Sequence, residues 1–256
     1  MQRILITGGK GYIATSLYNA LRNEFNIKLI TRNDFDLINS SETNKWFENN
    51  QYDTVIHTAI IGGRRVIEDT SSQLDNNLQM YYNLLQNKHC FNKFISFGSG
   101  AERDISTFYG LSKKIIADSM LTKDNFFNIR LYGLFDENEL PNRFIKQNLN
   151  RYISKKPIVI YRDKKMDFFY MEDFVDLVRY YLLEKNLPKE IDCTYDTSLK
   201  LSEIAAIINN ISNYNVPIRV EDEGNDLPYI GKPNTLLNFR GLKYGISKVY
   251  SILKYP

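Results

Sequence analysis

The sequence is poor in several features that would point to a particular class of protein. Its two cysteines, Cys90 and Cys193, lie far apart and have no metal-binding or redox spacing, so we expect no metal site and a reducing compartment without disulfides. No apolar run approaches the roughly 20 residues of a membrane span, which predicts a cytoplasmic protein without a membrane partner. The net charge is only +3, without a basic stripe, which argues against a nucleic-acid partner.

The composition is that of a folded protein with a large core, because 43% of the 256 residues are hydrophobic. In the first half, segments with strand patterns alternate with segments of helical spacing. This alternation predicts an α/β fold, a Rossmann-type doubly wound parallel sheet. The expected strands are 1–7, 27–31, 54–58, 93–97 and 127–131, and the expected helices are 12–22, 41–49 (capped by a serine), 73–86 and 108–121.

The rhythm changes after Gly133. We expect helices at 141–152, 172–184 and 201–211, a strand at 157–161, and a loop-rich tail. No flexible linker separates this part, so we interpret it as a small C-terminal lobe interleaved with the sheet. The predicted domains are a cofactor-binding domain, 1–133 with elements from about 165–185, and a substrate-binding lobe, 134–256.

A glycine turn follows the first strand. Gly8, Gly11 and Ala14 give the spacing G-x-x-G-x-x-A at the start of a helix, where backbone N–H groups can hold a pyrophosphate. A turn that merely needs glycine is the alternative. The second strand ends at Thr31 and Arg32 instead of at the acidic residue typical of NAD sites, and Lys10 adds a second positive charge. This pattern favours NADP(H), unless the two cations are simply solvated.

Three residues suggest hydride-transfer chemistry. Tyr109 and Lys113 are four residues apart, on one face of an expected helix, so the ammonium can lower the phenol pKa and assist proton exchange with a carbonyl oxygen. Ser99 follows an expected strand, at the sheet edge where such folds bind ligands, and its hydroxyl can hold the same oxygen. The alternative is a turn serine and a surface helix.

These residues resemble the extended short-chain dehydrogenase/reductase family, in its nucleotide-sugar branch. The likeness lies in the glycine turn, in the strand 55–59, and in the segment 167–173 that leads into the second lobe. The resemblance implies substrate contacts from Ser99, Tyr109 and Asn77. It implies cofactor contacts from Gly8, Lys10, Gly11, Tyr12, Ile13, Arg32, Asp36, Leu37, Thr58, Ala59, Tyr109 and Lys113.

Within that branch, residues 34–63 are most similar to the GDP-fucose synthases, which epimerise and then reduce a 4-keto sugar. The epimerase cysteine of those enzymes is replaced here by Ala101, and the only histidines, His57 and His89, lie outside the expected substrate lobe. Epimerisation needs an acid and a base, and neither is present where the resemblance requires it. Dehydratases of the family carry an Asp-Glu pair directly after the serine, whereas Glu102 is displaced by one position, which disfavours dehydration.

The sequence therefore predicts an NADPH-dependent oxidoreductase that reduces the 4-keto group of a nucleotide-linked deoxy sugar, GDP-linked by resemblance, in surface-polysaccharide synthesis. The resemblance also implies a homodimer, because helices equivalent to 73–86 and 108–121 form the interface in similar enzymes. Leu78, Tyr81 and Leu85 are apolar positions that belong either to that interface or to the core. One alternative is a 4-epimerase or dehydratase that retains NAD. An alternative of another class is a non-catalytic NADP-binding sensor domain.

Overall fold

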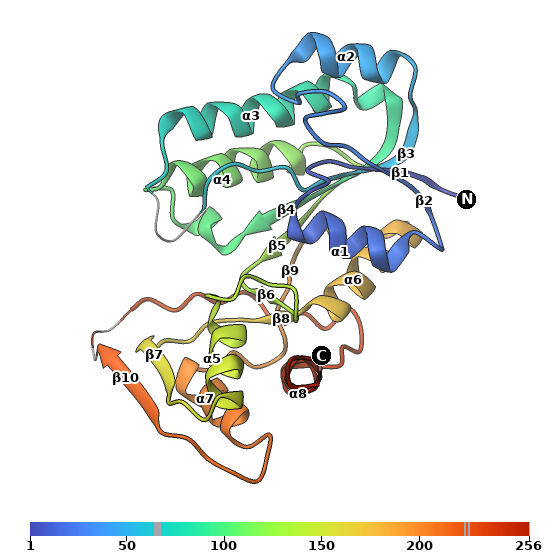
Figure 1. Ribbon diagram of the computed structural model, residues 1–256. Coiled ribbons are helices and arrows are strands. Elements are labelled where there is room, and N and C mark those ends of the chain that lie inside the picture. The colour runs from blue at the N-terminus through green and yellow to red at the C-terminus, as the bar shows by residue number, and fades with distance from the viewer. Residues whose placement is uncertain (64–67, 223, 225, 256) are drawn as a thin grey trace. The chain divides into compact units, whose positions relative to one another are not determined.

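A computed structural model of the protein describes residues 1–63, 68–222, 224 and 226–255 (Figure 1). The chain forms two compact units. Unit 1 consists of Met1–Arg130 and Arg179–Ile191, and unit 2 consists of Leu131–Val178 and the segment that follows Ile191. The sequence placed the first boundary at residue 133 and the returning segment at about 165–185. That the two parts bind cofactor and substrate respectively stays a prediction.

Unit 1 is built on a six-stranded sheet with the order β2-β1-β3-β4-β5-β9. Strand β1 lies between β2 and β3 and pairs with both in parallel, so that Ile4 is opposite Ile27 on one side and Thr54 on the other. This confirms the predicted doubly wound α/β fold. The strands are β1 (Arg3–Ile6), β2 (Asn26–Leu29), β3 (Tyr52–His57), β4 (Phe91–Ser99), β5 (Phe126–Leu131) and β9 (Glu190–Asp192).

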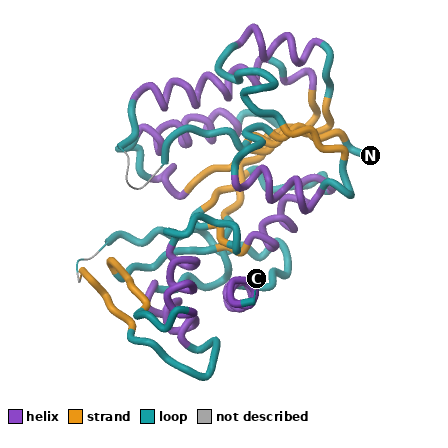
Figure 2. Tube along the Cα trace, viewed as in Figure 1, coloured by secondary structure: helices purple, strands orange, loops and turns teal. Residues whose placement is uncertain are grey.

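Helices cover this sheet, and the ribbon shows α3 and α4 side by side along one face (Figures 1 and 2). The core on that face contains Val55 and Phe94 from the strands together with Tyr81 and Leu84 from α3, all fully buried. The helical elements are α1 (Tyr12–Leu21), α2 (Ser40–Glu48), α3 (Ser71–Gln86), α4 (Phe108–Leu121) and two short 3-10 turns, η1 (Lys88–Cys90) and η2 (Gly100–Arg103).

Two details of unit 1 differ from the sequence-based expectation. Helix α2 is capped by Asn39, whose side chain accepts hydrogen bonds from the N–H groups of Ser41 and Glu42, so the predicted serine cap is wrong. Tyr81 is part of the core, and its hydroxyl donates to Ser119 at 3.0 Å. It is therefore not available to a dimer interface.

Unit 2 packs helices α5, α7 and α8 around a second core. Leu149 of α5, Ile204 of α7 and Ile246 of α8 are fully buried in it. Two small parallel sheets, β7 with β10 and β6 with β8, belong to this unit. Its elements are β6 (Leu134–Phe135), α5 (Phe144–Ile153), β7 (Ile158–Arg162), β8 (Phe169–Tyr170), α7 (Leu201–Asn209), β10 (Ile218–Asp222) and α8 (Leu242–Lys254), and α6 (Met171–Leu183) begins here and ends in unit 1.

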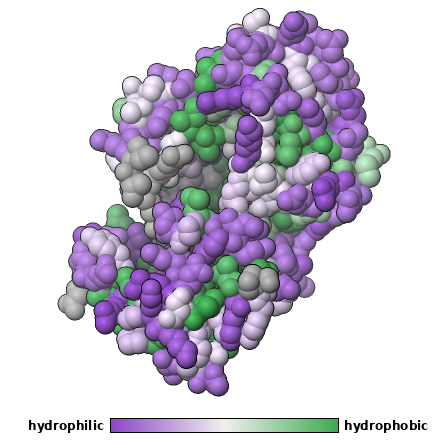
Figure 3. Space-filling model, viewed as in Figure 1, coloured by the Kyte–Doolittle hydropathy of each residue, from purple (hydrophilic) through white to green (hydrophobic). Residues whose placement is uncertain are grey.

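The expected loop-rich tail is wrong, because α8 occupies thirteen residues of it and β10 five. Strand β9, which closes the sheet of unit 1, was not predicted either. On the face drawn in Figure 3 the surface is largely hydrophilic, with small separate hydrophobic areas. In the described part of the chain no helix is long and apolar enough to cross a membrane.

Candidate active site

The glycine turn between β1 and α1 requires glycine for a reason that the structure makes explicit. Gly8 has φ +68°, and a Cβ on it would lie 2.9 Å from the backbone N of Ala59. The turn is fixed by hydrogen bonds from Gly9 N–H to the Ile30 carbonyl and from Gly11 N–H to the Gly8 carbonyl, both at 2.8 Å. Gly11 is the N-cap of α1, and no acidic side chain lies in the first helical turn. A phosphate can therefore approach this helix end closely.

A threonine that the sequence reasoning did not single out for a role holds the two sides of this turn together. The hydroxyl oxygen of Thr7 accepts hydrogen bonds from Thr58 N–H at 3.1 Å and Ala59 N–H at 3.2 Å, and lies 2.9 Å from Nδ1 of His57. Thr58 in turn donates its hydroxyl to the Thr7 carbonyl at 2.7 Å. These bonds place Thr58 and Ala59 against Gly8, where the sequence predicts cofactor contacts.

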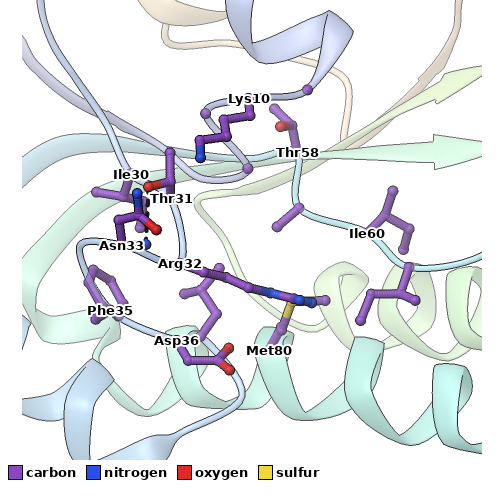
Figure 4. A pocket seen from close by; sticks show the side chains of 16 residues that line it. Lys10, Ile30, Thr31, Arg32, Asn33, Phe35, Asp36, Thr58, Ile60 and Met80 are labelled. Carbon is purple, nitrogen blue, oxygen red and sulfur yellow. Dashed lines mark hydrogen bonds between the residues drawn. The ribbon is translucent and has the colours of Figure 1, made fainter.

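A cavity of about 550 Å³ opens beside the glycine turn (Figure 4). This volume is in the range of small-molecule sites. Figure 4 shows Arg32 reaching over the cavity towards Met80, with Lys10 on the side of Thr31. Of the predicted cofactor contacts, Gly8, Lys10, Gly11, Arg32, Asp36, Leu37, Thr58 and Ala59 line the cavity, and Ile30, Asn33, Phe35 and Met80 also line it without having been predicted. Tyr12 and Ile13 are the first two residues of α1.

The charge at the end of β2 bears on the choice of cofactor. Asp34 is the acidic side chain nearest to that end in sequence, yet its carboxylate accepts from Thr31 N–H at 2.9 Å and pairs with Lys28 at 3.2 Å. The Thr31 backbone hydrogen bond, more than Lys28, lowers the pKa of Asp34. The carboxylate is therefore engaged within its own turn, and Asp34 does not line the cavity, whereas Arg32 and Lys10 do.

Ser99, Tyr109 and Lys113 all belong to unit 1. Ser99 ends β4 and is also the N-cap of η2, and Tyr109 lies in the first turn of α4. The start of α4 packs directly on η2, because a Cβ on Gly110 would lie 2.6 Å from the Ala101 carbonyl oxygen. The contact between η2 and α4 thus places the chain segment that carries Ser99 next to the one that carries Tyr109.

Lys113 connects this helix to the sheet. Its Nζ donates a hydrogen bond to the Phe97 carbonyl of β4 at 2.5 Å and lies 5.8 Å from the centroid of the Tyr109 ring. Phe97 is two residues before Ser99, so the ammonium is bound to the end of the strand that carries the serine. That Lys113 assists proton transfer by Tyr109 stays a prediction.

A second glycine segment passes over the phenol. Gly63 has φ +71°, and a Cβ there would lie 2.8 Å from Cε2 of Tyr109, so only glycine fits against the ring. The N–H of Gly63 donates to the Asp69 carboxylate at 2.9 Å. The loop after β3 therefore reaches both the cavity, through Ala59 and Ile60, and Tyr109.

Burial controls the charges around the site. Desolvation lowers the pKa of Lys113 to about 8, and the Glu102 carboxylate opposes this shift. Desolvation, helped by the positive charge of Lys113, lowers the pKa of His57 to about 3. At neutral pH most Lys113 is consequently protonated, whereas His57 is uncharged. The buried, neutral ring of His57 fits a structural role better than that of a base.

Asn77 joins helix α3 to the loop after β3. It is buried on α3, where its amide donates to the Ile61 carbonyl at 2.8 Å and accepts from the Ile61 N–H at 2.9 Å, while Ser112 lies 3.4 Å away. The residue thus fixes the loop after β3 to α3. Its predicted contact with substrate stays a prediction. No group of three metal-ligating side chains occurs among the residues that the structure describes.

The parallel sheet, the glycine turn at a helix end and the adjoining cavity define an α/β protein of the dinucleotide-binding type. The chain belongs to the NAD dependent epimerase/dehydratase family, which it matches over residues 4–193. No curated protein matches the sequence.

Several solved structures share the fold at low sequence identity. The GDP-mannoheptose C4 reductase MlghC from Campylobacter jejuni, with NADP bound, is 18% identical, with a TM-score of 0.77 over 99% of this chain and 98% of that one. A GDP-L-fucose synthetase from Naegleria fowleri bound to NADP is 15% identical, with a TM-score of 0.73 over 98% and 92%. WbmG from Bordetella bronchiseptica, in complex with NAD and UDP, is 16% identical, with a TM-score of 0.80 over 99% and 96%.

Proposed function

We propose that this protein is an NADPH-dependent reductase of the 4-keto group of a nucleotide-linked deoxy sugar, GDP-linked by resemblance. The observation that carries the proposal is that Ser99, Tyr109 and Lys113 lie on adjoining elements, β4 and α4, of one unit that also holds the glycine turn and its cavity. Two of the similar structures are those of a GDP-mannoheptose C4 reductase and a GDP-L-fucose synthetase, which supports the substrate class.

The residues around the cavity fit a dinucleotide. The space beside Gly8 is one that a Cβ would fill, and the free helix end at Gly11 is suited to a pyrophosphate. Arg32 and Lys10 offer positive charge to a 2′-phosphate, so NADP(H) is the proposed cofactor. The cofactor, when bound, supplies the hydride that reaches the carbonyl carbon.

The protein's own residues manage the carbonyl oxygen. The Ser99 hydroxyl donates a hydrogen bond to it, and the Tyr109 phenol transfers its proton as negative charge develops there. Lys113 stabilises the resulting tyrosinate by its charge, and the phenol regains a proton from solvent. The oxygen thereby becomes a hydroxyl, and the reduction is balanced by one hydride and one proton.

The proposal includes reduction without epimerisation. Ala101 occupies the place of the epimerase cysteine, and His57 is buried and uncharged. Glu102, the residue nearest in sequence to a dehydratase acid, is buried in an ion pair with Arg130 at 2.7 Å. None of these side chains offers a second acid or base beside the sugar.

A 4-epimerase that retains NAD is the second candidate, because WbmG, of the same fold, has NAD and UDP bound. The two candidates differ in redox balance. An epimerase returns its hydride and consumes no NADPH, whereas a reductase oxidises NADPH in proportion to product. A sensor domain would bind cofactor and turn over no keto sugar.

The test is an NADPH-oxidation assay across GDP-, dTDP-, UDP- and CDP-linked 4-keto sugars, with NMR of the product. We expect Tyr109→Phe to lower kcat by about 10²-fold or more with little change in NADPH affinity, since only the proton donor is removed. Tyr82→Phe, which alters an exposed tyrosine of α3, is the matched control. Bound NAD in the purified protein and no NADPH consumption with any sugar would overturn the reductase proposal.

The biological setting belongs to the same proposal: a role in surface-polysaccharide synthesis, a cytoplasmic location and a homodimer. Both cysteines are free thiols, which fits a reducing compartment. Tyr82 on α3 and Leu121 on α4 are exposed and offer apolar surface for a partner copy. Light scattering of the purified protein tests the dimer.

A further inference from the structure

A buried carboxylate lies at the turn that carries Ser99. Glu102 is only 4% exposed, and its Oε1 accepts a hydrogen bond from the Ser99 N–H at 2.9 Å. Its Oε2 accepts from Nε of Arg130 at 2.7 Å, and Nδ2 of Asn128 lies 3.3 Å from both oxygens. Both carboxylate oxygens are thus held by donors from β4 and β5, which makes Glu102 a fixed acceptor rather than a proton donor.

The sequence around Ser99 is arranged to admit this carboxylate. A Cβ on Gly98 would lie 2.0 Å from Oε1 of Glu102 and 2.6 Å from Oδ1 of Asn128, so only glycine leaves room. Ser99 and Glu102 also form a capping box across η2, in which the Ser99 Oγ accepts from the Ala101 N–H at 3.2 Å. Gly98, Ser99 and Glu102 therefore together fix the backbone of the turn and the orientation of the Ser99 side chain.

Arg130 is the counterion that permits a carboxylate at this depth. Its side chain is 15% exposed, and while Nε binds Glu102, Nη2 donates to Glu190 of β9 at 2.8 Å. A buried carboxylate without such a partner is strongly unfavourable, because desolvation is not compensated. The ion pair thus ties the Ser99 turn to the two strands at the edge of the sheet.

The same carboxylate acts on Lys113 by its charge. Burial lowers the pKa of Lys113 to about 8, and Glu102 is the group that opposes this shift. Two other side chains interact with Lys113: His57 on β3, which is uncharged at neutral pH, and Tyr109 on the same helix. Without the Glu102 charge, burial alone would act on Lys113, and burial favours the neutral amine.

We propose that Glu102 is a positioning residue of this site, whose carboxylate, held by Arg130, fixes the Ser99 turn and supplies a negative charge at the end of β4 to which Lys113 is also bound. The catalytic part of this inference rests on the proposed reductase function. The electrostatic part concerns Lys113 alone and is measurable without a substrate.

Two substitutions separate charge from position. Glu102→Gln keeps the shape and an acceptor for the Ser99 N–H but removes the charge, so we expect the Lys113 pKa to fall by about one unit. The high-pH limb of the kcat/KM profile for sugar reduction should move down by the same amount. Glu102→Asp keeps the charge but shortens the reach to Ser99, so kcat should fall about tenfold while the Lys113 pKa changes little.

The Lys113 pKa is read from trace acetylation of the intact protein by acetic anhydride across pH, followed by mass spectrometry. Glu190→Gln is the matched control, because it removes the other carboxylate bound to Arg130 but touches neither Ser99 nor η2. A folded Glu102→Gln variant with an unchanged Lys113 pKa overturns the inference, and so does an equal shift in Glu190→Gln.

Circular dichroism establishes folding, and if Glu102→Gln does not fold, an undiminished kcat in Glu102→Asp overturns the positioning role. Failure of the wild-type protein to reduce any keto sugar refutes the proposed function instead. In that case the acetylation series still decides whether Glu102 controls Lys113.

Discussion

His57 and Lys113 are residues whose basic groups both lose solvation on folding, with different consequences for the protein. The pKa of Lys113, at about 8, leaves it mostly charged at neutral pH, while that of His57, at about 3, leaves the ring neutral over the whole physiological range. The neutral ring lies 2.9 Å from the Thr7 hydroxyl, which also holds the backbone of Thr58 and Ala59. Protonation of His57 would therefore disturb the segment that faces the glycine turn.

This gives a prediction about acid stability. Because the pKa of His57 is about 3 in the folded protein and near 6.5 when unfolded, the unfolded chain binds the extra proton between these values. Stability is unaffected by His57 above the unfolded pKa and is lost as the pH falls towards the folded one. The free energy of unfolding should drop by about 2–3 kcal/mol from this residue between about pH 7 and pH 4.5. In urea titrations, His57→Gln should remove that part of the loss. The control His89→Gln, which replaces an exposed histidine, should not. If the free energy of unfolding of wild type and of His57→Gln falls in parallel with pH, the assignment to His57 is wrong.

Arg32 carries the prediction on cofactor choice. It reaches over the cavity, and Asp34 is engaged by Thr31 and Lys28, so Arg32 is available to pair with a 2′-phosphate. Arg32→Asp should weaken NADPH binding by about tenfold or more, while NADH binding changes little, because the affected interaction involves only the 2′-phosphate. Arg22→Asp, at the exposed end of α1, controls for the change in net charge. Fluorescence titration measures both constants, and an equal loss for the two cofactors would remove Arg32 from this role.

Sequence analysis identifies candidate residues from short spacings within one element. It does not reveal residues whose contacts lie far away in the sequence. Gly8, Tyr109 and Lys113 follow from short spacings within one turn or helix. Thr7 acts through residues 51 and 52 positions away, and Glu102 through Arg130, 28 positions away. Nothing in the local pattern reveals such contacts. The one hint was the position of Glu102, which is offset from the acidic pair of the dehydratases and therefore indicated a different role.

Helix α8 forms although two glycines lower its intrinsic helix propensity. Gly241 and Gly245 lie at its start, and glycine is the poorest helix former after proline. Yet Ile246, Val249 and Tyr250 recur at helical spacing and are buried in the core of unit 2, a signal that would have identified the helix. Packing of this apolar face outweighs the low propensity.

Gly245 is present in that helix because of its neighbours. A Cβ on it would lie 2.7 Å from Cγ of Tyr170 and 2.9 Å from Cζ of Phe135, so close packing requires glycine although alanine is the better helix former. We expect Gly245→Ala to destabilise the protein by about 1–3 kcal/mol, since overpacking exceeds the gain of about 1 kcal/mol in propensity. Ser247→Ala, on the exposed face of α8, should be neutral or slightly stabilising. Thermal and urea unfolding measure both variants; a gain in stability for Gly245→Ala would mean that Tyr170 moves aside at little cost.

At the scale of the whole molecule, the chain passes between the units after Arg130, Val178 and Ile191. The sequence showed the βα rhythm of the first 131 residues because each strand and helix there has a pattern of its own. It did not show β9, because three residues carry no period, and their place in the sheet is set by pairing with a strand about 60 residues earlier. Unit 1 is therefore not a continuous segment of the sequence.

A fragment that ends at residue 133 should consequently fail to fold. It lacks Arg179–Ile191, which supplies the first two residues of β9, the Lys189 carbonyl that accepts from Asn128 N–H at 2.9 Å, and the Glu190 partner of Arg130. It also lacks Tyr181, fully buried, whose ring lies 5.6 Å from that of Phe127. We expect the fragment to show no cooperative unfolding transition and no NADPH binding.

Joining 179–191 to that fragment through a flexible Gly/Ser linker of about 15 residues should restore both properties, because the missing strand then returns as an intramolecular partner at high effective concentration. A scrambled 179–191 sequence on the same linker is the control. Circular dichroism during urea unfolding and NADPH fluorescence measure the outcome. If the fragment 1–133 alone unfolds cooperatively and binds NADPH, then the sheet of unit 1 forms without β9, and this prediction is wrong.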